Sequence, residues 1–98
     1  TGVSGRVAQA IAEKIHKVSI DSQVLCISHL PQVAAMSDTH LYIEKETKDG
    51  RTKTSVQPLL FEEKVKEIAR MISGVEITDV TKKHAEELLK QADKLKTN

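Results

Sequence analysis

The chain has 98 residues, a formal net charge of +1, one cysteine and two aromatic residues. This length fits one small domain and excludes a complete nucleotide-binding enzyme domain. The charge does not indicate a nucleic-acid partner, and the scarcity of aromatics argues against a base-stacking platform. No apolar run reaches the about 18 residues of a membrane span, and a single cysteine forms no internal disulfide. We therefore expect one unit, residues 1–98, of a soluble cytoplasmic protein with no membrane partner.

A glycine-spaced loop, Thr1-Gly2-Val3-Ser4-Gly5, opens the chain. Ser4 is suited to cap a helix because its hydroxyl can accept a hydrogen bond from the first helical turn. Apolar residues then recur at helical spacing and form one stripe, made of Val7, Ile11, Ile15 and Val18. The pattern predicts a helix with one buried face.

Four consecutive apolar residues, Val24 to Ile27, predict a short strand over residues 24–28. Such a run is typical of a strand buried on both faces of a parallel sheet, which would also bury Cys26. Ser28 and His29 follow where the strand ends, and Pro31 suits the first turn of a helix over residues 32–36. Ligands of open α/β sheets bind beyond the carboxyl ends of strands, so His29 is the first candidate functional residue.

The next segment, residues 40–58, predicts an exposed antiparallel hairpin. Residues 40–46 alternate polar with apolar side chains, and the Asp49-Gly50 pair favours a tight turn. Pro58 should end the pairing, because proline lacks the N–H that a ladder requires. The sheet should therefore have parallel and antiparallel parts.

Two helices, over residues 61–73 and 79–95, should complete an α/β fold. The first has an apolar face, acidic residues in its first turn and Gly74 as its stop. Thr78 should cap the second, and the tail, residues 96–98, should be frayed. The two predicted apolar faces consist of Phe61, Val65, Ile68 and Ile72, and of Ala85, Leu88, Leu89, Ala92 and Leu95.

Residue chemistry alone leaves the role of His29 open between structural and functional. His16, His40 and His84 should be solvated, and no histidine pairs with another ligand at a zinc spacing. Ser28 beside His29 lacks a nucleophile elbow, which disfavours a serine hydrolase. The lysines alternate with acidic residues, as on an ordinary solvated surface.

Four stretches together closely resemble the C-terminal part of the RecN family: residues 1–5, 28–36, 38–43 and 70–74. RecN proteins repair bacterial DNA double-strand breaks and are of the structural-maintenance-of-chromosomes (SMC) type, with an ATP-binding-cassette (ABC) head. The resemblance implies the C-terminal lobe of an ABC/SMC-type P-loop NTPase head, with short parallel strands, flanking helices and an antiparallel hairpin.

The resemblance also implies roles for two loops. Residues Thr1, Gly2, Val3, Ser4 and Gly5 match the D-loop, which crosses the head dimer and helps align the nucleotide of the opposing head. Residues 28–32 match the switch-histidine loop, in which His29 lies near the γ-phosphate and the attacking water and Gln32 supports it. The implied cofactor is ATP with Mg²⁺. The implied partners are the remainder of the head, a second head of a homodimer, and DNA in the nucleoid.

The Walker A loop, the Q-loop, the signature motif and the Walker B carboxylates do not occur in these residues. We therefore expect a part of a head that begins just after Walker B and does not hydrolyse ATP alone. Apolar faces of the first helix and of strand 24–28 should lie partly uncovered and invite self-association. The alternatives are the head of another SMC-like or ABC-type ATPase, and a small α/β interaction module without nucleotide chemistry.

Overall fold

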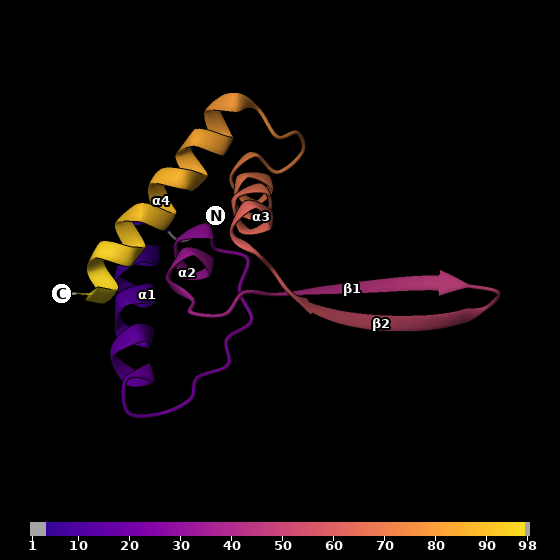
Figure 1. Cartoon of the computed structure of the whole chain (residues 1–98), viewed down its shortest axis with the longest axis horizontal. Helices are drawn as coiled ribbons and strands as arrows, with labels where there is room; N and C mark the ends of the chain where they lie inside the picture. Colours follow the sequence, from indigo (N-terminus) through magenta and orange to yellow (C-terminus); the bar gives the residue numbers. More distant parts are fainter. Residues whose placement is uncertain (1–3, 98) are drawn as a thin grey trace.

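Helices form the body of the molecule, and one hairpin extends from it (Figure 1). The computed structural model describes residues 4–97 and measures 49 × 35 × 30 Å. The elements follow in the order α1 (Gly5–Ser19), α2 (Pro31–Met36), β1 (Leu41–Lys48), β2 (Arg51–Pro58), α3 (Phe61–Ser73) and α4 (Asp79–Thr97). The described chain is thus a small α/β unit with an antiparallel hairpin.

Helix α1 begins at its predicted cap but buries a different face. The backbone N–H of Val7 donates to Ser4 Oγ over 3.3 Å, as a capping residue requires. The buried residues are Ala8 and Ala12, whereas the predicted stripe is largely exposed: Ile15 is half-buried and Val18 is 58% exposed. The prediction of a buried stripe was therefore wrong, since α1 packs against α2 through small side chains.

The predicted buried strand over residues 24–28 is not formed. Residues 23–30 have neither helical nor strand structure, Leu25 and Ile27 are 83% and 91% exposed, and Cys26 is exposed as well. A strand is stabilised by hydrogen bonds to a neighbouring strand. Within residues 4–97 the one sheet is the hairpin, whose two strands pair with each other. The parallel part of the predicted sheet is therefore absent from the described chain, because no strand is available beside it.

The predicted antiparallel hairpin is confirmed. Strands β1 and β2 pair antiparallel from Leu41 opposite Pro58 to Lys48 opposite Arg51. The two turn residues, Asp49 and Gly50, have φ values of 53° and 75°, as in a type I′ turn. Pro58 takes the last paired position, so the ladder ends where its missing N–H predicts.

Helices α3 and α4 begin and end at the predicted signals, with one exception. The N–H of Leu60 donates to Glu63 at the start of α3, and Gly74, with φ of 81°, ends it. Thr78 caps α4 through its hydroxyl, which accepts from the N–H of Thr81 over 3.1 Å. Helix α4 continues beyond the predicted end to Thr97, so the prediction of a frayed tail was wrong for the described residues 96 and 97.

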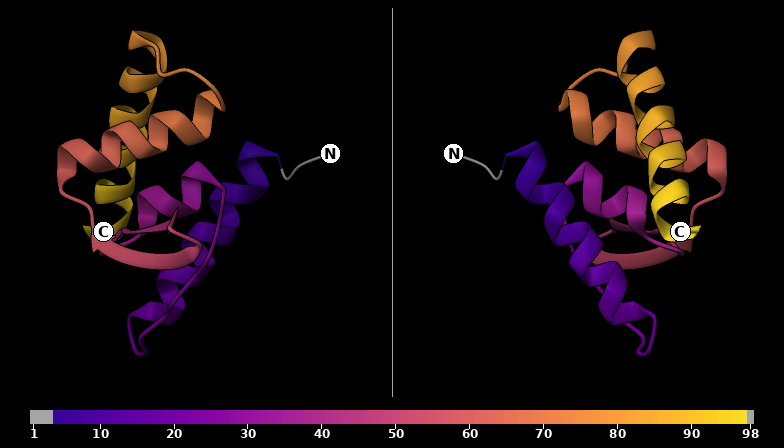
Figure 2. Two further views of the ribbon diagram at one scale, coloured as in Figure 1. Left: turned by 90° about the vertical axis from the view of Figure 1, so that its right-hand side faces the viewer. Right: turned by 90° about the vertical axis from the view of Figure 1, so that its left-hand side faces the viewer.

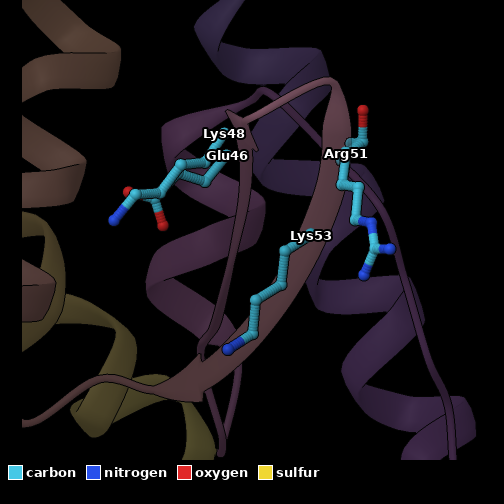
Figure 3. Close-up of a pocket in the computed structure, with 5 residues that line it drawn as sticks. Glu46, Lys48, Arg51 and Lys53 are labelled. Carbon is cyan, nitrogen blue, oxygen red and sulfur yellow. The ribbon is translucent and has the colours of Figure 1, made fainter.

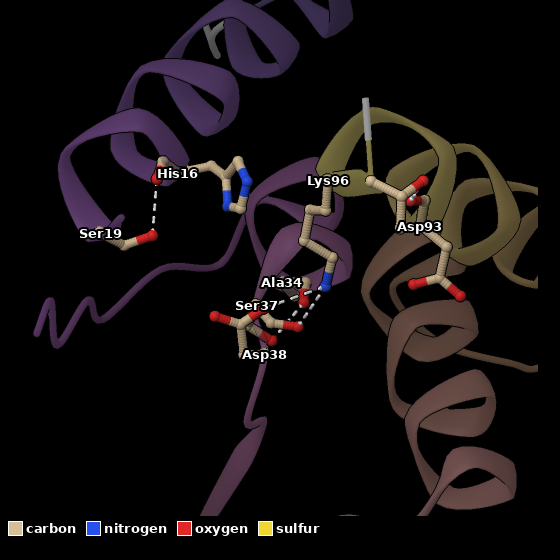
Figure 4. A network of polar contacts seen from close by, with 8 residues as sticks. His16, Ser19, Ala34, Ser37, Asp38, Asp93 and Lys96 are labelled. Carbon is tan, nitrogen blue, oxygen red and sulfur yellow. Dashed lines mark hydrogen bonds and ion pairs between the residues drawn. The ribbon is translucent and has the colours of Figure 1, made fainter. Parts of the chain in front are cut away.

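The C-terminal turn of α4 is held by a lysine whose role the sequence pattern did not indicate. Lys96 Nζ donates to the backbone carbonyl of Ser37 over 3.1 Å and lies 3.5 Å from Asp38 Oδ1 (Figure 4). Ser37 Oγ in turn donates to the carbonyl of Ala34 over 2.7 Å. These bonds satisfy carbonyls at the end of α2 and join them to the last turn of α4.

The core lies between the four helices, which Figure 2 shows from two sides. Six of the ten buried apolar residues are alanines, so the helices are joined largely by small side chains. Ile68 and Val65 of α3 are the largest fully buried side chains. The predicted faces of α3 and α4 are confirmed except for Phe61, which is 54% exposed. The core cluster consists of Ala12, Ala35, Met36, Val65, Ile68, Ala69, Ala85, Leu89 and Ala92.

The surface of the chain is larger than its mass predicts. The chain exposes 7707 Å², whereas a compact monomer of 10.9 kDa exposes about 5,600 Å². The extended segment, the hairpin and the outer stripe of α1 account for much of this surface, since their apolar side chains lie open. The expectation of uncovered apolar faces is thus confirmed, and self-association stays a prediction. Among the described helices, none combines the length and apolar character that a membrane crossing needs.

Candidate functional site

His29 lies in an exposed turn directly before a helix. Ser28 Oγ accepts a hydrogen bond from the N–H of Leu30 over 3.0 Å, which closes a tight turn around His29. Pro31 then occupies the first position of α2, where its fixed φ favours helix formation. Within residues 4–97, the His29 side chain makes no hydrogen bond or ion pair. Its imidazole is therefore free to act on a group outside the described chain.

The structure brings the end of the first loop next to the residue after this turn. A Cβ atom added to Gly5 would lie 3.4 Å from Gln32 Nε2, at ordinary van der Waals distance. Helices α1 and α2 pack together and so join the two segments that carry candidate residues. The other candidates of that loop, Thr1, Gly2 and Val3, lie outside the described residues. Ser4 is engaged as the cap of α1.

A groove of about 930 Å³ runs between the helical body, the extended segment and the base of the hairpin. Its lining includes both His29 and His40, together with exposed apolar side chains. Leu25 and Ile27 reach it from the extended segment, and Ile43 reaches it from β1. A largely apolar hollow of this size with a few polar groups is typical of a binding site. The groove is open, since the predicted strand along one side has no partner.

His40 at the base of the hairpin is half-buried, which corrects the prediction that it is solvated. Its carbonyl accepts from the N–H of Leu59 over 2.9 Å, whereas its buried Nδ1 has no partner within the described chain. Burial lowers the pKa of His40 below the ordinary 6.5, Glu67 opposes this shift, and nearby Lys64 adds to it. The strand alternation gave no sign that α3 would cover this residue.

The lowered pKa of His40 predicts a loss of stability in mild acid. As the pH falls through 6.5, His40 takes up a proton in the unfolded chain before it does so in the folded chain. The free energy of unfolding therefore decreases as the pH decreases. We expect urea midpoints to fall between about pH 7.5 and about pH 5.5, and to fall less in the His40→Gln variant, which lacks this titration. Equal falls in both proteins would contradict the assignment.

Metal ligands do not cluster in the part of the chain that the structure describes. No three His, Cys, Asp or Glu side chains there converge on one point. Glu67, the acid nearest to His40, accepts a hydrogen bond from Arg70 Nε and is only 9% exposed. This pairing occupies Glu67 with a neighbour on α3. The described chain therefore offers single polar side chains along an apolar groove and not a preformed ion site.

Comparison with known proteins gives close relatives that are DNA repair proteins named RecN. The chain is 79% identical over 97 residues to the DNA repair protein RecN of Bacillus subtilis, covering 99% of this chain and 17% of that protein. It is 68% identical over 98 residues to RecN of Halalkalibacterium halodurans and 46% identical over 88 residues to RecN of Rickettsia conorii. Over its whole length, this chain is homologous to one part of RecN. No family model matches it.

The RecN match includes the whole candidate site. An alignment over 97 of the 98 residues spans the His29 turn, α2 and the hairpin together. The chain nevertheless spans about a sixth of the length of the RecN proteins it matches, at 17% of the Bacillus protein. Most of a RecN protein therefore lies outside these residues.

Proposed function

We propose that this chain is part of a RecN-like DNA repair ATPase and supplies His29 to an ATP site that the rest of the protein completes. The similarity to RecN, at 79% identity, carries the repair role. The exposed turn at His29 supports the catalytic one, because Ser28 and Pro31 hold its backbone while the His29 side chain makes no hydrogen bond or ion pair within residues 4–97. ATP with Mg²⁺ is the proposed cofactor.

Phosphoryl transfer depends chiefly on positioning and on stabilising charge. An imidazole at His29 can hydrogen-bond a phosphoryl oxygen and hold the attacking water in line with the bond that breaks. Gln32 lies three residues further, in the first turn of α2, and its side-chain amide lies near Gly5, which suits it to a supporting role beside the nucleotide. The Mg²⁺ ion neutralises phosphate charge when bound, and its ligands come from residues beyond those described here.

Residues 1–5 have the second proposed role, as a D-loop that aligns the nucleotide of an opposing head. Support comes from Ser4 and Gly5, which lie at the N-terminus of α1 beside Gln32. A loop there that reached across a dimer would remain joined, through α1 and α2, to the turn that holds His29. A second head is thus the proposed partner on this side.

The remainder of the head is the proposed partner for the uncovered apolar surface. Residues 24–28 carry the apolar run of a buried strand but lie open, with Leu25 and Ile27 more than 80% exposed. Pairing with a strand from the remainder would satisfy their backbone groups and remove their side chains from water, which is favourable by about 25 cal/mol per Å² of apolar surface. The rival proposal, an interaction module without nucleotide chemistry, uses the same surface.

ATP turnover after mixing tests this proposal. Turnover is measured for this chain alone, for a Bacillus subtilis RecN that lacks the matched stretch, and for the mixture of the two. We expect neither part to hydrolyse ATP and the mixture to do so. A RecN chimera, in which this chain replaces the matched stretch of the Bacillus protein, is the positive control for folding of the composite. Turnover by the chain alone, or an inactive chimera, would overturn the proposal.

A further inference from the structure

The outer part of the hairpin, residues 44–55, is polar throughout, and we call it the hairpin tip. Its sequence, EKETKDGRTKTS, has no apolar or aromatic side chain, and all of its residues except the half-buried Ser55 are exposed. Protein partners bind chiefly through buried aromatic and apolar anchors. The hairpin tip lacks such anchors, so it fits a partner that is recognised by charge and hydrogen bonding.

Positive charge gathers at the end of the hairpin tip. Lys48 and Arg51 lie directly opposite each other in the strand register, and like charges in that position repel. Figure 3 shows their side chains extending away from each other. Neither they nor Lys53 form an ion pair within residues 4–97. Between residues 47 and 53 the only carboxylate is Asp49. Three cations are therefore left for an external anion.

The nearest acidic residue beyond the turn, Glu46, shares the face of these cations and offsets part of their charge, which leaves an excess of positive charge. Glu46 lies opposite Lys53 in the register, yet no ion pair joins them. Both residues line a shallow hollow of about 500 Å³ beside Lys48 and Arg51. The hydroxyls of Thr47 and Thr52, 3.5 Å apart, lie on the opposite face of the hairpin, so the cations alone can attract an anion on this face.

The shape of the hairpin matches one form of nucleic acid. Each strand has eight residues, or about 26 Å of ribbon, and Figure 1 shows it reaching well beyond the helices. A two-stranded ribbon fits the major groove of duplex DNA, which is about 12 Å wide. Single strands are instead bound by stacking on aromatic side chains, of which the hairpin tip has none.

We propose that the hairpin tip binds the phosphate backbone of duplex DNA through Lys48, Arg51 and Lys53. The choice of DNA rests on the proposed function, since a DNA repair protein meets this polyanion. Binding through phosphates is independent of sequence and weakens as salt rises, because each contact releases counterions. The hairpin would hold the protein on DNA, while the His29 turn lies across the protein's apolar groove from the base of the hairpin.

Duplex binding by the RecN chimera tests this proposal, measured as fluorescence anisotropy of a labelled oligonucleotide duplex at several salt concentrations. The variant Lys48→Gln/Arg51→Gln removes two cations and also relieves their mutual repulsion, so the hairpin should persist, as far-UV circular dichroism can check. We expect weaker binding and a salt slope, in log K against log salt, that is shallower by about 1.8. The matched control, Lys90→Gln/Lys94→Gln, removes two exposed cations from α4 and should keep the slope.

Two results would overturn the proposal: an unchanged slope in the hairpin variant, or an equal change in the control, which would assign the effect to total charge. ATP turnover without DNA separates this test from that of the proposed function. A hairpin variant with weakened DNA binding and unchanged turnover supports the tip as a DNA contact. If the chimera is inactive but its DNA binding still depends on Lys48 and Arg51, the ATPase proposal fails and the hairpin proposal stands.

Discussion

Replacing His29 with alanine in the RecN chimera is expected to lower ATP turnover about 100-fold, the scale on which misplaced reacting groups act. The side chain is exposed and makes no hydrogen bond within residues 4–97, so its removal should leave the free energy of unfolding unchanged. The turn itself is held by Ser28 and Pro31, which the substitution does not touch. Steady-state turnover and urea unfolding of the same preparation measure the two effects.

His84→Ala is the matched control for this prediction. His84 is also exposed, but it lies on α4, among charged residues and away from the groove. We expect the control to retain full turnover. Full activity in His29→Ala would remove His29 from the chemistry, and loss of folding in that variant would assign it a structural role. DNA binding by His29→Ala should stay intact, because the hairpin tip is unaltered.

The second large effect is expected at Ile68, whose side chain is fully buried in α3. Its replacement by alanine leaves a cavity among Met36, Leu89 and the surrounding alanines, because helices can close such a space only in part. We expect a loss of about 2–5 kcal/mol in the free energy of unfolding. In a small domain this is a large fraction of the total, so the midpoint of urea unfolding should fall markedly.

Ile20→Ala makes the same chemical change at a position that is 70% exposed. It should alter the free energy of unfolding by less than about 0.5 kcal/mol, as surface substitutions usually do. The difference between the two variants chiefly measures burial, since the change in side-chain size is the same and Ile20 lies just after the end of α1. Similar losses in both would mean that the core does not lie between α3 and α4.

Local signals in the sequence correctly predicted the turn and the helix ends that neighbouring residues determine. The Asp49-Gly50 pair supplies the positive φ angles of the turn, Gly74 ends α3, and Thr78 caps α4. Each signal acts through neighbouring residues, so no distant partner is needed. Periodicity likewise predicted which faces of α3 and α4 are buried, because these helices pack against each other within the described chain.

Predictions that depended on distant partners failed. The run from Val24 to Ile27 has the composition of a buried strand, but burial needs neighbouring strands, and the described chain provides none. For the same reason the apolar stripe of α1 is largely exposed. Lys96 and His40 were missed because their environment comes from segments far away in sequence: Ser37 for the lysine, α3 for the histidine. The position of His29 before a helix was predicted, whereas its chemistry remains a proposal.

The alanine-rich core also limits how this chain can diverge. A buried alanine such as Ala69 or Ala85 can become smaller only as glycine, which costs about 1 kcal/mol in a helix. It can become larger only if the helices separate, because close-packed interiors have little room for an added methylene. Few of the buried positions in the helical body can therefore change without a loss of stability. Substitutions on the surfaces that face the groove and the solvent cost less, because they leave this close packing unchanged.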